Sequence, residues 1–183
     1  MIVETIFSTV DENGRPNFAP MGLVWGEKFA TVLPFSQTQT CRNLRLTRYG
    51  VANLSDDVLA YVQSALYDSS LPHFTAKAGP GVVFSNTCSW REMEVVSQSE
   101  TAERAEFGCR IVYEGRRRDF LGFRRASNAV IEATILATRR KLFAPSILEE
   151  RLRHYREIVE KTGDAMDKEA FQMVYDFVQK GAQ

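Results

Sequence analysis

Hydrophobic positions in the first two thirds of the chain alternate with polar ones or gather in short β-branched runs, a pattern typical of β-strands. Residues 5–10 form the first such segment, and they end at a loop around Asn13-Gly14, a dipeptide that suits a tight hairpin. Further strands are expected at residues 17–25, 29–33, 51–54, 90–97 and 102–113. The last of these segments alternates strictly from Ala105 onwards, which predicts a half-buried strand.

Two short helices are expected between these strands. The first covers residues 42–49 with Thr38 or Thr40 as its N-cap, because hydroxyl side chains accept hydrogen bonds from the first helical N–H groups. The second covers residues 58–66, behind two acidic residues that favour the positive end of a helix dipole. Residues 68–81 contain Ser, Pro and Gly and predict a surface loop.

The pattern changes to helical spacing in the last third of the chain. Three helices are expected there, at residues 127–140, 146–161 and 166–180. Because strands and helices are segregated along the chain, the sequence predicts a mainly β protein of the α+β class. We expect one domain at residues 1–123 and a C-terminal helical subdomain, of about three helices, at residues 124–183.

Composition narrows the possible functions of the 183 residues. Lys plus Arg and Asp plus Glu both number 23, so no net charge favours nucleic acid, and no apolar run is long enough to span a membrane. The N-terminus lacks the basic and apolar regions of a signal peptide. Cys41, Cys88 and Cys109 are widely spaced and only two histidines are present, which favours reduced cysteines, no metal site and a cytoplasmic location.

Two segments carry candidate chemistry. Residues 36–43 place hydroxyl, amide and guanidinium groups before a helix, which is the composition of a phosphate-binding loop and equally of a polar loop that caps a helix. The segment Ala19-Pro20-Met21-Gly22 lies within a strand, where Pro indicates an edge or a bulge and Gly permits close approach of a ligand. An edge with free backbone groups can hydrogen-bond a planar heterocycle, whereas a plain bulge has no function of this kind.

The chain resembles the flavin reductase-like, FMN-binding split-barrel superfamily, and more narrowly an uncharacterised branch known as domain of unknown function family 447. The resemblance covers residues 2–180 and rests on four elements. They are Ala19-Pro20-Met21-Gly22, Thr40-Cys41-Arg42-Asn43-Leu44, Val51-Ala52-Asn53, and the pair Val130-Ile131-Glu132-Ala133 and Ala137-Thr138-Arg139.

The resemblance implies a homodimer of six-stranded Greek-key split β-barrels, with FMN bound between the subunits. It assigns the FMN phosphate to Ser36, Thr38, Thr40 and Asn43, with assistance from Arg42. The isoalloxazine would meet the backbone of Pro20, Met21 and Gly22, with Asn53 close by. Further cofactor-binding candidates are Arg124, Asn128 and Arg139, which would reach the phosphate of the same or the partner's flavin.

Three functions are compatible with such a site. The first is an FMN-dependent oxidoreductase of the flavin reductase kind, acting on an unknown small molecule. No catalytic acid or histidine of that superfamily can be matched in this sequence. A flavin-binding or carrier protein without turnover is the second. The third replaces FMN with another planar ligand such as pyridoxal phosphate, a deazaflavin or haem.

Overall fold

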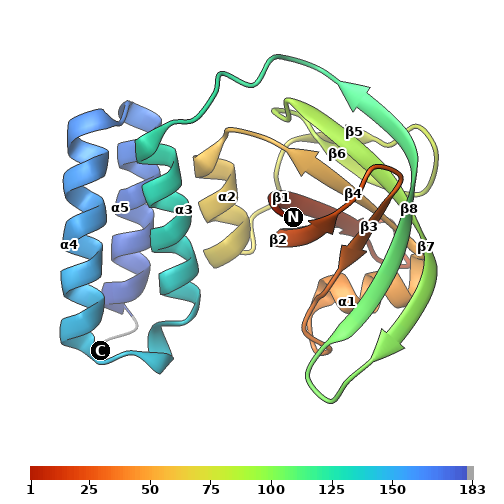
Figure 1. The fold of residues 1–183 in the computed structure, drawn as a ribbon, viewed down its shortest axis with the longest axis horizontal. Helices are drawn as coiled ribbons and strands as arrows, with labels where there is room; N and C mark the ends of the chain where they lie inside the picture. The colour runs from red at the N-terminus through yellow and green to blue at the C-terminus, as the bar shows by residue number, and fades with distance from the viewer. Residues whose placement is uncertain (181–183) are drawn as a thin grey trace. The chain divides into compact units, whose positions relative to one another are not determined.

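Six strands close an antiparallel barrel in this computed structural model, which describes residues 1–180 (Figure 1). Around the barrel the order is β1 (Ile2–Val10), β2 (Pro16–Trp25), β3 (Phe29–Val32), β8 (Ala105–Arg116), β7 (Ser89–Glu100) and β4 (Tyr49–Leu54). Strand β4 pairs with β1 and completes the circle. One seam is weak, because β3 pairs with β2 only at residues 24 and 25. The predicted six-stranded antiparallel barrel in an α+β chain is confirmed.

The turn between β1 and β2 has the geometry that its Asn-Gly dipeptide predicts. Gly14 has a φ of +76°, a left-handed conformation that glycine adopts without steric cost. The Asp11 carboxylate accepts a hydrogen bond from the backbone N–H of Asn13 at 2.8 Å. This turn sets the register of the two strands, in which Thr5 lies opposite Met21.

Helix α1 (Gln39–Thr47) packs two fully buried side chains, Cys41 and Leu44, into the barrel core. The helix begins three residues earlier than predicted, because Thr38 and not Thr40 is its N-cap. It ends before residue 49, which the sequence pattern assigned to the helix and the structure assigns to β4. The left-handed conformation of Arg48, with a φ of +53°, separates the two elements.

The segment predicted as a surface loop at residues 68–81 contains a strand. Strand β5 (His73–Thr75) pairs with β6 (Val82–Phe84) in a two-stranded sheet. The hydroxyl of Ser8 donates to the carbonyl of Val82 at 2.6 Å, so β1 of the barrel holds this small sheet. Hydrogen bonds from the barrel therefore stabilise a segment whose composition alone predicted a loop.

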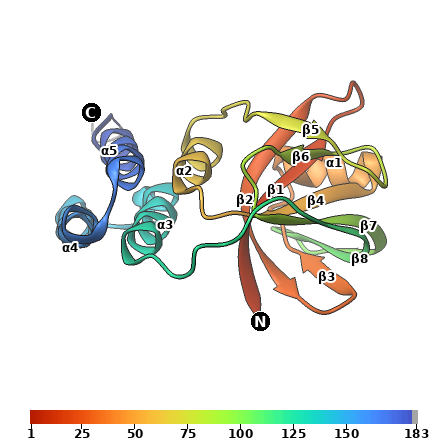
Figure 2. The same ribbon diagram turned by 90° about the horizontal axis from the view of Figure 1, so that it is seen from above.

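The remaining helices form a second unit with its own core, seen nearly end on in Figure 2. They are α2 (Val58–Leu66), α3 (Arg125–Thr138), α4 (Pro145–Thr162) and α5 (Ala165–Lys180), with the 3-10 turn η1 (Arg140–Leu142) after α3. The barrel unit comprises residues 1–55 and 69–120, and the helical unit comprises residues 56–68 and 121–183. The expected domain at residues 1–123 included helix α2. The structure places α2 in the helical unit, because Val58 and Val62 are buried in the helical core. No helix in the described part of the chain is long and apolar enough to cross a membrane.

Candidate functional site

At the weak seam of the barrel, the pairing of β2 with β3 does not reach the predicted Pro20-Met21-Gly22 element. The N–H of Trp25 donates to the Met1 carbonyl at 2.8 Å, which fixes the phase of the β1–β2 ladder. Hydrogen-bonded and non-hydrogen-bonded pairs alternate in an antiparallel ladder. The N–H and C=O of Gly22 and the C=O of Pro20 therefore point away from β1, towards the seam.

The same element is an edge and not a bulge, because its register with β1 is continuous. Pro20 costs the ladder no hydrogen bond, since its missing N–H would face the seam. Met21 packs against the barrel core, and its carbonyl accepts a hydrogen bond from the Thr5 hydroxyl at 3.0 Å. A Cβ at Gly22 would meet Oε1 of Glu4, the end of a flexible side chain on the opposite strand, at 2.9 Å.

The loop before α1 holds a buried hydroxyl without a partner. Within residues 1–180, Ser36 Oγ is buried and makes no hydrogen bond. Nearby, the Thr38 hydroxyl accepts from the N–H of Cys41 at 3.3 Å and donates to the Phe35 carbonyl at 2.8 Å. The N–H groups of Gln39 and Thr40 lie in the first helical turn, which has no intrahelical acceptor for them. Unused donors therefore gather at this helix N-terminus.

Two of the predicted phosphate ligands have other partners. Thr40 is 2% exposed, and its hydroxyl accepts from Asn17 Nδ2 at 3.1 Å. Asn43 is 1% exposed; its Nδ2 donates to Thr9 Oγ1 at 3.0 Å, and its Oδ1 accepts from Gln39 Nε2 at 2.6 Å. Both side chains dock α1 onto β1 and β2. These bonds position the loop from the barrel side.

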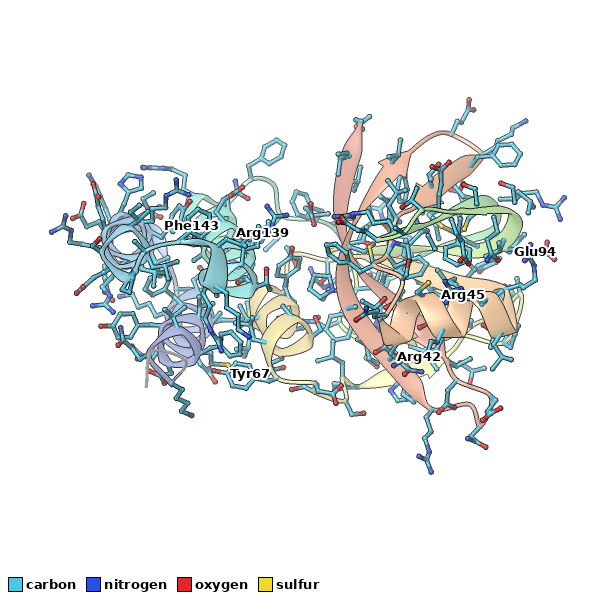
Figure 3. The ribbon with its side chains drawn as sticks, turned by 90° about the horizontal axis from the view of Figure 1, so that it is seen from below. Arg42, Arg45, Tyr67, Glu94, Arg139 and Phe143 are labelled. Atoms are coloured by element: carbon cyan, nitrogen blue, oxygen red, sulfur yellow. The ribbon has the colours of Figure 1, made fainter. Side chains whose placement is uncertain are left out.

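Arg42 folds back on its own loop, on the exposed side of α1 (Figure 3). It donates to the Gln37 carbonyl at 2.8 Å and to Gln39 Oε1 at 2.7 Å. A second guanidinium, which the sequence analysis missed, lies against the same loop from another part of the chain. Arg104 donates to the Leu33 carbonyl at 3.0 Å and stacks on the Phe35 ring at 4.1 Å. Only the pairing of distant segments brings it there, and no local motif indicates it.

Asn53 is fully buried, and its amide joins three strands. Its Nδ2 donates to the Ile6 carbonyl at 2.8 Å and to Ser8 Oγ at 3.1 Å, while its Oδ1 accepts from the N–H of Phe84 at 2.9 Å. These bonds link β4 to β1 and β6. The amide therefore has a structural role inside the barrel, and the expected position of Asn53 close to a flavin stays a prediction.

The three candidates in the helical unit differ in availability. Arg124 forms ion pairs with Asp164 at 2.6 Å and with the fully buried Asp167 at 2.5 Å. Ser127 donates to the second carboxylate of that pair at 2.9 Å, so Arg124 belongs to a polar network at the start of α5. Asn128 is exposed on α3. Arg139 is exposed at the C-cap of the same helix (Figure 3).

A buried carboxylate that sequence reasoning missed lies on β7. Glu92 is fully buried and accepts hydrogen bonds from the Tyr49 hydroxyl at 2.6 Å, from Trp90 Nε1 at 3.0 Å, and from the N–H groups of Lys77 and Ala78 at 2.9 Å and 2.6 Å. Burial alone would raise the pKa of Glu92, but these donors outweigh it and lower that pKa. Burial and the neighbouring carboxylate raise the pKa of Tyr49. The cluster fixes the loop after β5 to the barrel.

The two histidines lie on elements other than the β2 edge and the loop before α1. His73 is exposed, its Nδ1 lies 2.8 Å from the Leu71 carbonyl, and its ring lies 5.8 Å from that of Phe18. His154 lies on α4 in the helical unit. Among residues 1–180, no group of three or more His, Cys, Asp or Glu side chains could hold a metal ion. What the arrangement offers is an unpaired backbone edge and a set of donors at a helix N-terminus.

Comparison with known proteins gives family matches along nearly the whole chain. Residues 3–118 match the N-terminal domain of a protein family of unknown function, DUF447, and residues 124–176 match the further DUF447 domain. Among curated proteins, none matches.

Solved structures include a full-length likeness. The FMN-bound protein MM1853 from Methanosarcina mazei is 25% identical, with a TM-score of 0.84 over 96% of this chain and 94% of that one. The flavin reductase of styrene monooxygenase from Pseudomonas putida S12 has a TM-score of 0.54 at 18% identity, over 64% of this chain and 82% of its own. A Shewanella frigidimarina protein with a split-barrel domain has a TM-score of 0.57 at 12% identity, over 66% of this chain and 70% of its own. The last two likenesses concern the fold.

Proposed function

Because this chain belongs to the DUF447 family, we propose that it binds FMN non-covalently and acts as a flavin-dependent oxidoreductase on a small molecule. The observation that carries the proposal is the likeness to FMN-bound MM1853, which extends over 96% of this chain. FMN supplies hydride and electron transfer when it is bound, whereas the protein supplies position and electrostatics.

The residues present fit a flavin phosphate at the loop before α1. Ser36 Oγ is a buried hydroxyl whose hydrogen bond is not made within residues 1–180. A buried polar group without a partner is costly, and a phosphate oxygen would satisfy it. The N–H groups of Gln39 and Thr40 and the positive end of the α1 dipole favour an anion at the same place. Arg104 supplies a guanidinium beside this loop.

The free edge of β2 fits the other end of the cofactor. The pyrimidine part of an isoalloxazine carries both hydrogen-bond donors and acceptors. The N–H of Gly22 can donate to this part of the ring, and the carbonyls of Pro20 and Gly22 can accept from it. In this proposal the residues of β2 orient the ring, and Met21 contributes the apolar surface behind the strand.

The homodimer, with FMN between the subunits, and the cytoplasmic location stay part of the proposal. In a dimer the exposed Asn128 and Arg139 are the members of the helical unit that remain available to a flavin. Arg124 is committed to two aspartates, and we therefore assign it to the structure of its own unit.

A second function, flavin binding without turnover, is favoured by one observation. The proposed flavin site, from Pro20 to Gly22 and from Ser36 to Asn43, contains no acid and no histidine. Proton transfer at this site would therefore depend on the substrate, on water or on a group from a neighbouring element, such as the Glu4 carboxylate opposite Gly22 on β1.

The absorption spectrum of the purified protein tests the proposal. Bands in the flavin range, with FMN identified by mass after heat release, are the expected result. Steady NADH or NADPH oxidation by the holoprotein then supports the oxidoreductase, and a flavin that is never turned over supports the carrier. A colourless protein that takes up no added FMN contradicts both.

A further inference from the structure

A cleft of about 500 Å³ lies at one end of the barrel, where β7 begins and β8 ends. Its lining includes Ser89, Arg91, Glu114, Arg116, Arg118 and Phe120. All of these residues belong to the barrel unit, and none was among the site residues predicted from the sequence.

The strand register shows that the polar lining belongs to the inner face of the barrel. Arg91 lies opposite Ala52 on β4, and Ala52 lies opposite Phe7 on β1. Directly opposed residues of neighbouring strands share a face of the sheet, and both Phe7 and Ala52 are part of the barrel core. Arg91 and its opposite residue Glu114 therefore continue the inner face into the mouth of the barrel.

The outer face of the same strand ends is closed by aromatic packing. The Trp90 ring lies across Gly115, where a Cβ would come within 2.1 Å of it, and it packs edge-on against Phe74 at 5.6 Å. Small-molecule sites occur in the mouths of β-barrels and have volumes of about 300–1,000 Å³.

The charges in the cleft are unbalanced. Three arginine side chains line it against a single carboxylate, that of Glu114. Arg91 is held by that carboxylate at 3.2 Å and by the Trp90 carbonyl at 3.0 Å. Arg118 is held by the backbone carbonyl of Asn86 at 3.0 Å. Two guanidinium groups are therefore positioned before any ligand arrives.

The third arginine is more exposed to solvent. The side chain of Arg116 is 74% exposed, and it pairs with Asp119, which is equally exposed. An exposed ion pair of this kind contributes little free energy, about 0–1 kcal/mol. Arg116 can therefore exchange this carboxylate for the acidic group of a ligand at small cost.

We propose that this cleft binds a small phosphate monoester that carries a ring, with the phosphate against the three arginines. Several guanidinium groups around one dianion are the usual recognition of phosphate. The volume exceeds that of inorganic phosphate, and Phe120, which is 54% exposed, offers an apolar surface for a ring. The site is separate from the proposed flavin phosphate loop, so it holds whether or not FMN is turned over.

Calorimetric titration of the purified full-length protein with AMP, adenosine and inorganic phosphate tests the assignment. AMP should bind, adenosine should bind at least about tenfold more weakly because it lacks the phosphate, and inorganic phosphate should bind more weakly because it lacks the ring. Arg116→Gln should weaken AMP binding about tenfold. Arg110→Gln is the matched control, because Arg110 lies in the middle of the same strand, outside the cleft lining, and has an exposed ion pair with Glu94.

A gain-of-affinity variant guards against effects of misfolding. Glu114→Gln removes the only carboxylate of the lining and should tighten AMP binding severalfold, whereas the control Glu94→Gln should not. Absence of AMP binding, equal binding of AMP and adenosine, or unchanged AMP affinity in both cleft variants overturns the assignment. Displacement of FMN by AMP, or loss of FMN from Arg116→Gln, also overturns it, because the cleft would then belong to the flavin site.

Discussion

The buried hydroxyl of Ser36 gives a prediction in which protein stability and cofactor affinity change in opposite directions. Ser36→Ala removes an oxygen that has no hydrogen-bond partner within residues 1–180. In the absence of FMN the variant should be as stable as the wild type or more stable. In the presence of FMN it should bind the cofactor less well. A hydroxyl that only stabilised the loop would change both quantities in the same direction.

The magnitudes follow from the cost of an unmade hydrogen bond. A buried polar group without a partner costs about 1–3 kcal/mol, so the unfolding free energy of the apoprotein should rise by up to that amount. A hydrogen bond to a charged phosphate contributes about 1.5–3 kcal/mol. Its loss corresponds to roughly a 10- to 150-fold weaker FMN affinity.

Two measurements separate these effects. Urea unfolding of the apoprotein gives the change in stability, and fluorescence titration gives the FMN affinity. Riboflavin is the matched control ligand because it lacks the phosphate, and its affinity should be equal in the two proteins. Thr38→Ala is the control variant: it removes the α1 N-cap, and about 1 kcal/mol of stability should be lost. If Ser36→Ala destabilises the apoprotein and leaves FMN affinity unchanged, Ser36 does not face the phosphate.

Three further predictions concern neighbouring groups. Asn53→Ala should destabilise the barrel by about 3 kcal/mol in urea unfolding, since it removes three buried hydrogen bonds at about 1 kcal/mol each, while the folded fraction keeps its FMN affinity. Folding lowers the pKa of Glu92 below its usual value of 4.5. The ionised carboxylate therefore contributes its full share of the unfolding free energy at neutral pH, and this share is lost as the pH falls through the lowered pKa. In urea unfolding at a series of pH values, Glu92→Gln should remove this loss of stability at low pH. At pH 7 the variant should have an unfolding free energy about 3 kcal/mol lower than the wild type. Arg104→Gln should weaken FMN binding about tenfold in fluorescence titration, and Arg42→Gln less, because Arg42 is bonded within its own loop; equal losses would place both guanidinium groups at the phosphate.

Local patterns predicted the barrel well because they act over short distances. The alternation of residues 105–113 and the Asn13-Gly14 turn both appear in the structure as expected. Element ends were less predictable. Residue 49 has an aromatic side chain compatible with helix or strand, and its pairing opposite Glu94 on β7 assigns it to the strand. Likewise β5 is too short to show a pattern, and it forms because β6 and the barrel supply its partners.

Composition gave two candidate segments, the loop at residues 36–43 and the edge at residues 20–22, and their role as a cofactor site stays a prediction. Within residues 1–180, the loop holds the unpartnered Ser36 hydroxyl, and the edge lies beyond the pairing of β2 with β3. Which polar side chains are free could not be read from the sequence. Asn43, for example, bonds Thr9, 34 residues earlier on β1, and Asn53 bonds the Ile6 carbonyl, 47 residues earlier on the same strand. Arg104 was missed for the same reason, since only the fold brings it to the loop.

The hydrogen bonds around α1 separate the motif that makes the fold from the residue that would serve the cofactor. In the Thr-x-x-Asn-Leu stretch, Thr40 bonds Asn17, Asn43 bonds Thr9, and Leu44 is buried in the barrel core. Every one of these contacts docks the helix, and none requires a ligand. A barrel could therefore keep the whole stretch and still bind no flavin. Ser36 differs because no contact within residues 1–180 accounts for its buried hydroxyl. The identity of this one residue, more than the motif beside it, should distinguish a flavin-binding barrel from one that shares only the fold.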